Sequence, residues 1–115
     1  MEKPIKINVK NKIRLILIIA RTHPGESPSS YVCQGFIEFL LNNNQLSNIL
    51  RENFIFKIIP MLNPDGVFLG NNRCNLIGHD LNRSWHHATI FSHPTVYATI
   101  NMLKEYLNSD VRSSI

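Results

Sequence analysis

An almost unbroken apolar run at residues 13–20 constrains the fold more than any other feature of the sequence. It reads IRLILIIA, and Arg14 is the only charge that interrupts it. A continuous run rich in β-branched residues is typical of a strand that is covered on both faces within a parallel sheet. A second run of this kind, FIFKII at residues 54–59, ends at Pro60. The two runs predict neighbouring strands of an α/β fold.

The segment between these two runs has a helical pattern. Residues 29–41 carry apolar side chains at helical spacing, and Ser27 and Pro28 before them are typical of a helix start. Residues 46–52 predict a second, shorter helix. A strand, a helical segment and another strand form a βαβ unit, in which the strands are parallel and the crossover is right-handed.

The stretch at residues 61–92 shows no clear helical or strand period. An irregular segment of this length inside a compact domain is frequently functional. Within it, the sequence NPDG at residues 63–66 has the composition of a β-turn, and a turn alone would account for it. Residues 94–107 resume a helical pattern.

The composition describes a single folded domain. The chain has 115 residues, of which 43% are hydrophobic and 17% are charged, as in ordinary globular proteins. No apolar run approaches the roughly 18 residues that span a membrane, and the first residues lack the features of a secretory signal. Two cysteines do not make a disulfide framework. We therefore expect a cytoplasmic protein without membrane association.

The formal net charge of +4 raises the question of a nucleic-acid partner. The basic residues are dispersed along the chain and are not interleaved with aromatic ones, so we expect no nucleic-acid binding. The same excess of positive charge would suit an acidic peptide substrate.

Two candidate zinc ligands, His23 and Glu26, follow the first predicted strand. Ligands of open α/β sheets bind at the carboxyl ends of the strands. A set of two histidines and one glutamate with an open fourth position is a catalytic zinc arrangement. The pair therefore indicates the start of a hydrolase centre. The alternative is that both residues only cap the helix that begins near Ser27.

Three polar residues of the irregular segment would meet this pair. If the strands are parallel, their carboxyl ends lie at one edge of the sheet, and the loop that leaves this edge carries Arg73, Asn82 and Arg83. Arginine can bind a carboxylate with two parallel hydrogen bonds, and Asn82 adds amide donors. A metal that polarises a carbonyl, with arginines for an oxyanion and a carboxylate, is the set that a carboxypeptidase needs.

Each of these polar residues also has a structural alternative. Arg73 and Arg83 would ordinarily be solvated surface residues, with Asp80 as an ion-pair partner for one of them. Trp85 is most simply a packing residue. Four further histidines are expected at the surface rather than among the ligands: His79, His86, His87 and His93.

Taken together, these segments resemble the cytosolic carboxypeptidases, M14-type zinc carboxypeptidases that trim glutamates from tubulin tails. The resemblance lies in four segments, in this order: HPGE at 23–26, FKIIPMLNPDGV at 56–67, NRC at 72–74 and DLNRSW at 80–85. The stretch SPSSYVCQG at residues 27–35 most resembles the type numbered six. The likeness extends over residues 13–107.

The resemblance implies roles for five residues. His23 and Glu26 match two of the three zinc ligands. Arg73 matches the arginine that polarises the scissile carbonyl and stabilises the oxyanion. Asn82 and Arg83 match the pair that holds the terminal carboxylate of the substrate.

The resemblance also implies the fold, the cofactor and the partners. The implied fold is an α/β/α sandwich around a mixed sheet, present here in part. Zn²⁺ is the implied cofactor. The implied substrates are acidic peptide tails, above all polyglutamylated tubulin, and the implied location is the cytoplasm in association with the cytoskeleton.

The chain departs from the family pattern in what it lacks. The third ligand of the family, a histidine, lies beyond the segment that matches residues 93–97, and the catalytic glutamate lies further on. None of the three candidate glutamates, Glu38, Glu52 and Glu105, matches that base. We expect a flexible segment at 1–12, a partial catalytic domain at 13–108 and a tail at 109–115, and an isolated chain that is weakly stable and without peptidase activity.

Two alternatives to a carboxypeptidase remain at this point. A zinc amidohydrolase of the aspartoacylase or succinylglutamate desuccinylase kind has a similar layout of ligands and arginine, but it favours Gly-Asn-Glu after the first histidine, where this chain has Pro24-Gly25-Glu26. The other alternative is a non-catalytic remnant in which Arg73, Asn82 and Arg83 bind acidic tails without cleaving them.

Overall fold

Two parallel strands form the sheet in residues 14–112, the part of the chain that the computed structural model describes. β1 (Arg14–Ile19) pairs with β2 (Phe54–Ile59) so that Arg14 lies opposite Phe54 and Ile19 opposite Ile59. The predicted parallel pair and its α/β class are therefore confirmed. Ile13 and the predicted flexible segment 1–12 lie outside the described residues.

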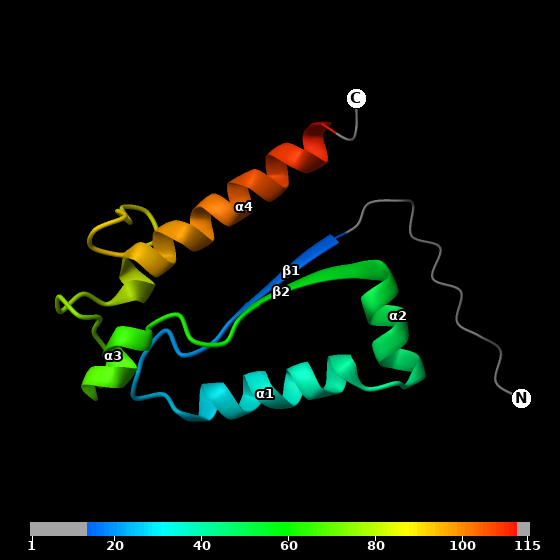
Figure 1. The fold of residues 1–115 in the computed structure, drawn as a ribbon, viewed down its shortest axis with the longest axis horizontal. Helices are drawn as coiled ribbons and strands as arrows, with labels where there is room; N and C mark the ends of the chain where they lie inside the picture. Colours follow the sequence, from blue (N-terminus) through cyan, green and yellow to red (C-terminus); the bar gives the residue numbers. More distant parts are fainter. Residues whose placement is uncertain (1–13, 113–115) are drawn as a thin grey trace, which may run out of the picture.

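Helices lie on both sides of this sheet (Figure 1). α1 (Pro28–Leu41) runs along one face, where Phe36 packs edge-on against Phe56 of β2 with ring centroids 6.0 Å apart. α4 (Pro94–Arg112) runs along the other face and extends five residues beyond the predicted range. The arrangement is the α/β/α layering that the sequence predicted, on a sheet that has two strands in the described residues.

α2 (Gln45–Asn53) connects α1 to β2 and begins with a capping box. The Asn44 side chain accepts a hydrogen bond from the Ser47 amide, and the Ser47 hydroxyl receives one from the Asn44 amide. These bonds satisfy two backbone donors that a helix start leaves unpaired, so the turn between α1 and α2 is sharply defined.

The prediction that residues 61–92 lack regular structure was wrong in two places. α3 (Pro64–Leu69) starts where a β-turn was expected, and a 3₁₀ helix follows at Leu81–Arg83. Asn63 caps α3 because its side chain accepts from the Gly66 amide at 3.0 Å, and Pro64 occupies the first helical position. The helix is too short to show a period in the sequence.

A small core lies at the carboxyl end of the strands. Leu62, Leu81 and Val96 are fully or almost fully buried and pack together, with partly buried neighbours at Ile19, Ile59, Trp85, Ala88 and Ile100. This core joins the strand ends to the 3₁₀ helix and to the start of α4, so it holds the segments that carry the predicted site residues.

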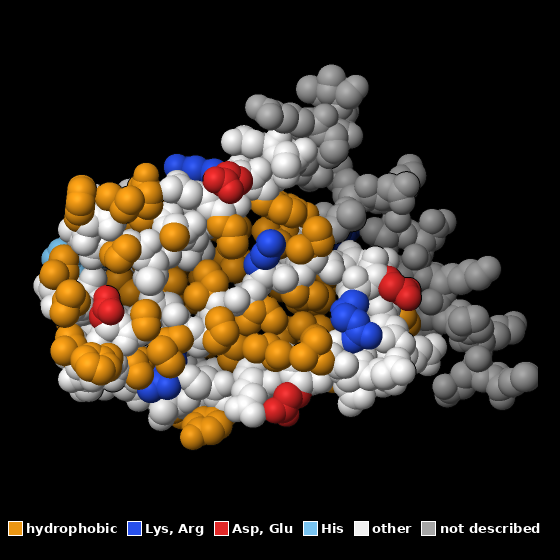
Figure 2. Space-filling model, in the orientation of Figure 1, with side chains coloured by type: hydrophobic (Ala, Val, Ile, Leu, Met, Phe, Trp, Pro, Cys, Tyr) orange, Lys and Arg blue, Asp and Glu red, His pale blue; other side chains and the backbone are white. Residues whose placement is uncertain are grey.

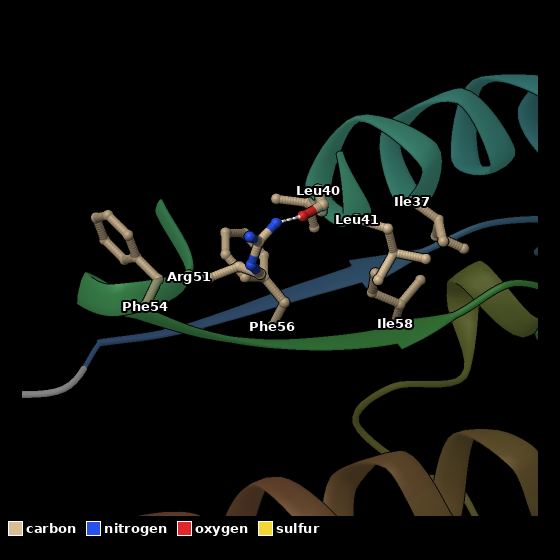
Figure 3. Close-up of a pocket in the computed structure, with 7 residues that line it drawn as sticks. All are labelled: Ile37, Leu40, Leu41, Arg51, Phe54, Phe56 and Ile58. Carbon is tan, nitrogen blue, oxygen red and sulfur yellow. Dashed lines mark hydrogen bonds between the residues drawn. The ribbon is translucent and has the colours of Figure 1, made fainter. Parts of the chain in front are cut away.

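Hydrophobic side chains also gather on the surface over the sheet, between the two flanking helices (Figure 2). An apolar pocket lies between the end of α1 and β2 (Figure 3), lined by Ile37, Leu40, Leu41, Arg51, Phe54, Phe56 and Ile58. Among the described residues, no helix has the length and apolar character to cross a membrane.

Candidate metal centre

The turn that follows β1 brings His23 and Glu26 together. The Glu26 amide donates to the His23 carbonyl at 3.1 Å, which closes the turn. Nδ1 of His23 then lies 3.2 Å from Oε1 of Glu26. His23 is buried, whereas the Glu26 side chain is 65% exposed. One nitrogen and one oxygen of the two predicted ligands thus lie next to each other.

The predicted alternative, that this pair serves only to cap α1, does not describe these contacts. Ser27 occupies the N-cap position of α1, but its side chain makes no capping hydrogen bond. Glu26 contributes its backbone carbonyl, which accepts from the Ser29 amide and hydroxyl at 3.1 and 2.7 Å. Its carboxylate turns away from the helix and faces His23.

Asp80 connects the histidine to the other predicted site residues. Its Oδ1 lies 3.0 Å from Nε2 of His23 and accepts from the Asn82 amide at 2.9 Å. Its Oδ2 accepts from Nε of Arg73 at 2.7 Å. The structure therefore brings His23, Arg73 and Asn82 to a single carboxylate that is 16% exposed. The sequence placed Asp80 only as an ion-pair partner, because its contact with His23 spans 57 residues.

These contacts set the protonation state of Asp80. Burial by itself would raise the pKa of this carboxyl group. Hydrogen bonds from His23, the Asn82 amide and Arg73, with the positive charge of Arg73, act in the other direction, and the net pKa lies below the ordinary value of 3.8. Asp80 is therefore an ionised acceptor at neutral pH.

Arg83 stands apart from this cluster. It is exposed, and within residues 14–112 its guanidinium donates only to the Asn82 carbonyl, at 3.4 Å. The Asn82 side chain accepts from the indole nitrogen of Trp85 at 3.2 Å, so the half-buried Trp85 packs against the core and also orients Asn82. Both Asn82 and Arg83 lie on the 3₁₀ helix that Asp80 caps.

The donor set fits a zinc ion. Two ligands of a tetrahedral zinc ion, each about 2.0–2.2 Å from the metal, lie about 3.3–3.5 Å from each other, close to the 3.2 Å between His23 Nδ1 and Glu26 Oε1. The other ring nitrogen faces a carboxylate, the partner that fixes the ring of most metal-binding histidines. Across residues 14–112, no group of three or more His, Cys, Asp and Glu side chains is placed to hold a metal.

Two glycines allow the turn at residues 23–26, which we call the ligand turn, to pack closely against its neighbours. A Cβ atom on Gly66 would lie 2.5 Å from the Pro24 ring and 2.6 Å from the backbone oxygen of Cys74. A Cβ atom on Gly25 would lie 2.1 Å from the Asn72 side chain, and the Gly25 amide donates to the Asn72 carbonyl at 2.8 Å. The turn, α3 and the loop before Arg73 therefore meet without room for a methyl group.

We expect Gly66→Ala to destabilise the chain by about 1–3 kcal/mol or more, because the added methyl group meets a backbone oxygen that cannot rotate away. Gly35→Ala is the matched control. It lies inside α1 with open space around it, and it should stabilise the chain by about 0.5–1 kcal/mol. The urea midpoints of the three proteins test this, and equal midpoints for Gly66→Ala and the unaltered chain would contradict the packing described here.

One of the histidines expected at the surface is buried. His93 is 3% exposed, and its Nε2 lies 2.9 Å from Nδ1 of the exposed His79. The His87 ring packs edge-on against the His93 ring. Nδ1 of His93 is buried with no hydrogen-bond partner among the described residues. The expectation of a surface position was therefore wrong for His93, because Asn75 and the start of α4 fold the loop over it. The Asn75 side chain holds this loop closed with bonds to the Ser92 carbonyl and the His79 amide.

We expect the chain to lose stability on acidification through His93. Burial lowers its pKa below the ordinary value of 6.5, and the neighbouring His79 and His87 lower it further. Between the lowered pKa of His93 in the folded chain and its ordinary pKa in the unfolded chain, the unfolded chain binds a proton that the folded chain does not. The stabilising contribution of neutral His93 is therefore complete above about pH 6.5 and is lost as the pH falls toward the lowered pKa. Thermal unfolding from about pH 7.5 to about pH 5.5 measures the effect. The exposed His86→Gln should keep the pH slope and His93→Gln should reduce it, whereas the same slope in both variants would contradict this origin.

Comparison with known proteins agrees with this geometry. A sequence model described as zinc carboxypeptidase matches residues 4–110, nearly the whole chain. The chain belongs to the zinc carboxypeptidase family. Cytosolic carboxypeptidase 6 from Caenorhabditis elegans is 55% identical over 96 residues, which are 84% of this chain and 21% of that protein. Cytosolic carboxypeptidase 6 from Mus musculus is 45% identical over 112 residues, 97% of this chain and 21% of that protein.

Solved structures show the same fold. A metallo-carboxypeptidase from Burkholderia cenocepacia superposes with a TM-score of 0.78 at 30% identity, over 86% of this chain and 27% of that one. A metallo-carboxypeptidase from Pseudomonas aeruginosa gives a TM-score of 0.78 at 31% identity, over 85% and 26%. The predicted resemblance to cytosolic carboxypeptidases is confirmed, and the family match favours it over the amidohydrolase alternative. The chain spans about a fifth of the length of these two cytosolic carboxypeptidases.

Proposed function

We propose that this chain supplies part of the active site of a zinc carboxypeptidase. The observation that carries the proposal is the convergence of His23, Arg73 and Asn82 on the Asp80 carboxylate, beside the facing atoms of His23 and Glu26. In this assignment His23 and Glu26 hold the zinc ion, which when bound polarises the scissile carbonyl and activates water.

The residues of the chain would then act on the substrate in a defined way. The His23 ring binds through Nδ1 while its Nε2–H donates to Asp80, which keeps the ring in one tautomer and one orientation. Arg73 uses Nε to bind Asp80, and its other two nitrogens make no hydrogen bond within residues 14–112. These two nitrogens are the donors for a carbonyl oxygen that becomes negatively charged.

We assign the terminal carboxylate of the substrate to Arg83 and Asn82. Arg83 is exposed and makes no ion pair with a carboxylate within residues 14–112, so its guanidinium is available for a bidentate hydrogen bond to a free carboxylate. The net charge of +4 favours acidic peptides. Polyglutamylated tubulin tails are the substrate we propose, with the cytoplasm and the cytoskeleton as the location. The relatives' names, cytosolic carboxypeptidases, support the cytoplasmic part of this proposal.

We propose further that the 115 residues alone are inactive. The two predicted ligands are fewer than the three protein ligands of a catalytic zinc site, and none of the glutamates at 38, 52 and 105 matches the family's base. A general base typically contributes 10²–10⁴-fold to the rate, as an order of magnitude.

The test compares the 115-residue chain with the protein encoded by the whole reading frame that contains it. Both are assayed, with and without a zinc chelator, on a peptide that ends in glutamates, on the same peptide with an amidated terminus, and on an N-acyl amino acid. We expect chelator-sensitive cleavage of the free-acid peptide by the longer protein only. Turnover by the short chain would overturn its proposed inactivity. Cleavage of the N-acyl amino acid alone would support the amidohydrolase, and binding of the acidic peptide without cleavage by the longer protein would support the non-catalytic remnant.

A further inference from the structure

Arg21, two residues before the turn at residues 23–26, has an unusual backbone. Arg21 has φ = 50°, and it is the only described residue other than glycine with a positive φ. A side chain makes this left-handed conformation costly, and such residues persist where the surrounding structure over-determines them. Its amide donates to the Ser29 hydroxyl at 3.1 Å, and its carbonyl accepts from the Asn63 amide at 3.1 Å. The strained residue is thus held between α1 and the N-cap of α3.

The side chain of Arg21 contacts the ligand turn. Nε and Nη2 both donate to the Pro24 carbonyl, at 3.0 and 2.9 Å, and Nη1 donates to the Ser30 hydroxyl at 3.0 Å. The Pro24 carbonyl belongs to the backbone that links the two predicted ligands. A guanidinium that donates two hydrogen bonds to one oxygen restricts the position of that oxygen more than a single donor does.

The ligand turn also makes close contacts that do not involve Arg21. The Pro24 ring is buried against Gly66, which has no room for a methyl group. The next residue, Gly25, is tied to the Asn72 carbonyl. The close contact with Gly66 restricts movement of the Pro24 peptide toward α3, and the Arg21 guanidinium holds the Pro24 carbonyl from the side of α1.

We propose that Arg21 is a positioning residue of the zinc site. Its guanidinium holds the Pro24 peptide so that Nδ1 of His23 and Oε1 of Glu26 keep the spacing of two zinc ligands, and the strained backbone aims the side chain at this peptide. Arg21 does not touch the metal or the substrate. This inference rests on the zinc site of the proposed function.

The test is a Zn²⁺ titration of the 115-residue chain, followed by NMR through the His23 ring resonances, with the melting temperature of the metal-free chain as a second readout. Arg21→Gly removes the guanidinium and also removes the strain, because glycine tolerates a positive φ. We expect it to weaken zinc binding by about 10-fold or more, as for other partners that orient metal ligands. Arg21→Lys keeps the charge but offers a single compact donor, and we expect an intermediate affinity.

Arg51→Ala is the matched control. Its guanidinium also donates to backbone carbonyls, those of Leu40 and Asn42, but at the opposite end of α1 (Figure 3). We expect it to lower the melting temperature and to leave the zinc affinity unchanged. A loss of zinc affinity in Arg51→Ala equal to that in Arg21→Gly would assign the effect to general stability and overturn the inference.

The outcomes separate this inference from the proposed function. If Zn²⁺ does not perturb His23 in the unaltered chain, the zinc assignment itself fails. If Zn²⁺ binds at His23 with equal affinity in the unaltered chain and in Arg21→Gly, only the positioning role fails. Should Arg21→Gly not fold, equal affinity in Arg21→Lys and the unaltered chain overturns the inference in the same way.

Discussion

Replacing His23 by glutamine is expected to remove zinc binding by the chain and to reduce peptide hydrolysis by the longer protein to the level of the chelated enzyme. Glutamine fills much of the space of the ring but offers no imidazole nitrogen. The remaining ligand of the pair, Glu26, has a 65% exposed side chain and no other hydrogen-bond partner among the described residues. Changes to residues that only orient a metal ligand cost 10–100-fold in affinity, so we expect loss of the ligand itself to cost more than about 100-fold.

The measurement is a Zn²⁺ titration of the chain together with kcat/KM of the longer protein on a peptide that ends in glutamates. His86→Gln is the control, because His86 is exposed and lies outside the cluster around Asp80. Unchanged zinc affinity in His23→Gln would show that the metal, if it binds, binds elsewhere. Loss of activity with unchanged zinc content would assign His23 a role other than ligand.

The sequence was sufficient to predict the parts of the fold that depend on local pattern. β1 and β2 are apolar runs that each contain a single charged residue, Arg14 and Lys57, and β2 has the predicted bounds Phe54–Ile59. α1 begins at the predicted Pro28. The proximity of His23 and Glu26 could be predicted because the two candidate ligands lie within four consecutive residues after a strand, so their geometry is nearly a property of the turn.

The parts that the sequence did not reveal depend on contacts between distant residues. The role of Asp80 requires His23, which lies 57 positions earlier in the chain. The burial of His93 depends on a hydrogen bond from Asn75 to Ser92 across 17 positions. The hydrogen bonds from the Arg21 side chain to the Pro24 carbonyl depend on a positive φ at Arg21. A positive φ is uncommon for residues other than glycine, so an arginine at this position does not predict it. In each case the residue type was visible, but the partner was not.

A local signal for α3 and for the Asp80 cap was present and could have been used. Asn63 and Pro64 are a favoured cap and first residue, and Gly70 ends α3 in the left-handed conformation. Asp80 accepts from the amide two residues later, the common pattern of an aspartate that starts a turn. Turn chemistry, rather than hydrophobic period, would have resolved the stretch that looked irregular.

Asp80→Asn is the second change for which we expect a large effect, because one carboxylate serves three partners. Oδ1 faces Nε2 of His23 and the Asn82 amide, and Oδ2 accepts from Arg73. Asparagine keeps the shape, but its NH₂ group must face either the histidine or the arginine, where a donor would meet a donor. Removing an acceptor from a buried donor costs the full desolvation of that donor.

We therefore expect zinc affinity to fall about 10–100-fold through the His23 ring, and kcat of the longer protein to fall about 10²–10³-fold through the misdirected Arg73. Asp65→Asn is the control, since Asp65 is an exposed carboxylate in the first turn of α3. The double variant Arg73→Ala/Asp80→Asn separates the two routes. If Asp80 acts on catalysis by orienting Arg73, adding Asp80→Asn to Arg73→Ala should lower kcat little further while zinc affinity still falls. Fully additive losses in kcat would mean instead that Asp80 acts on the reaction without Arg73, and the contact between Arg73 and Asp80 would then be structural only.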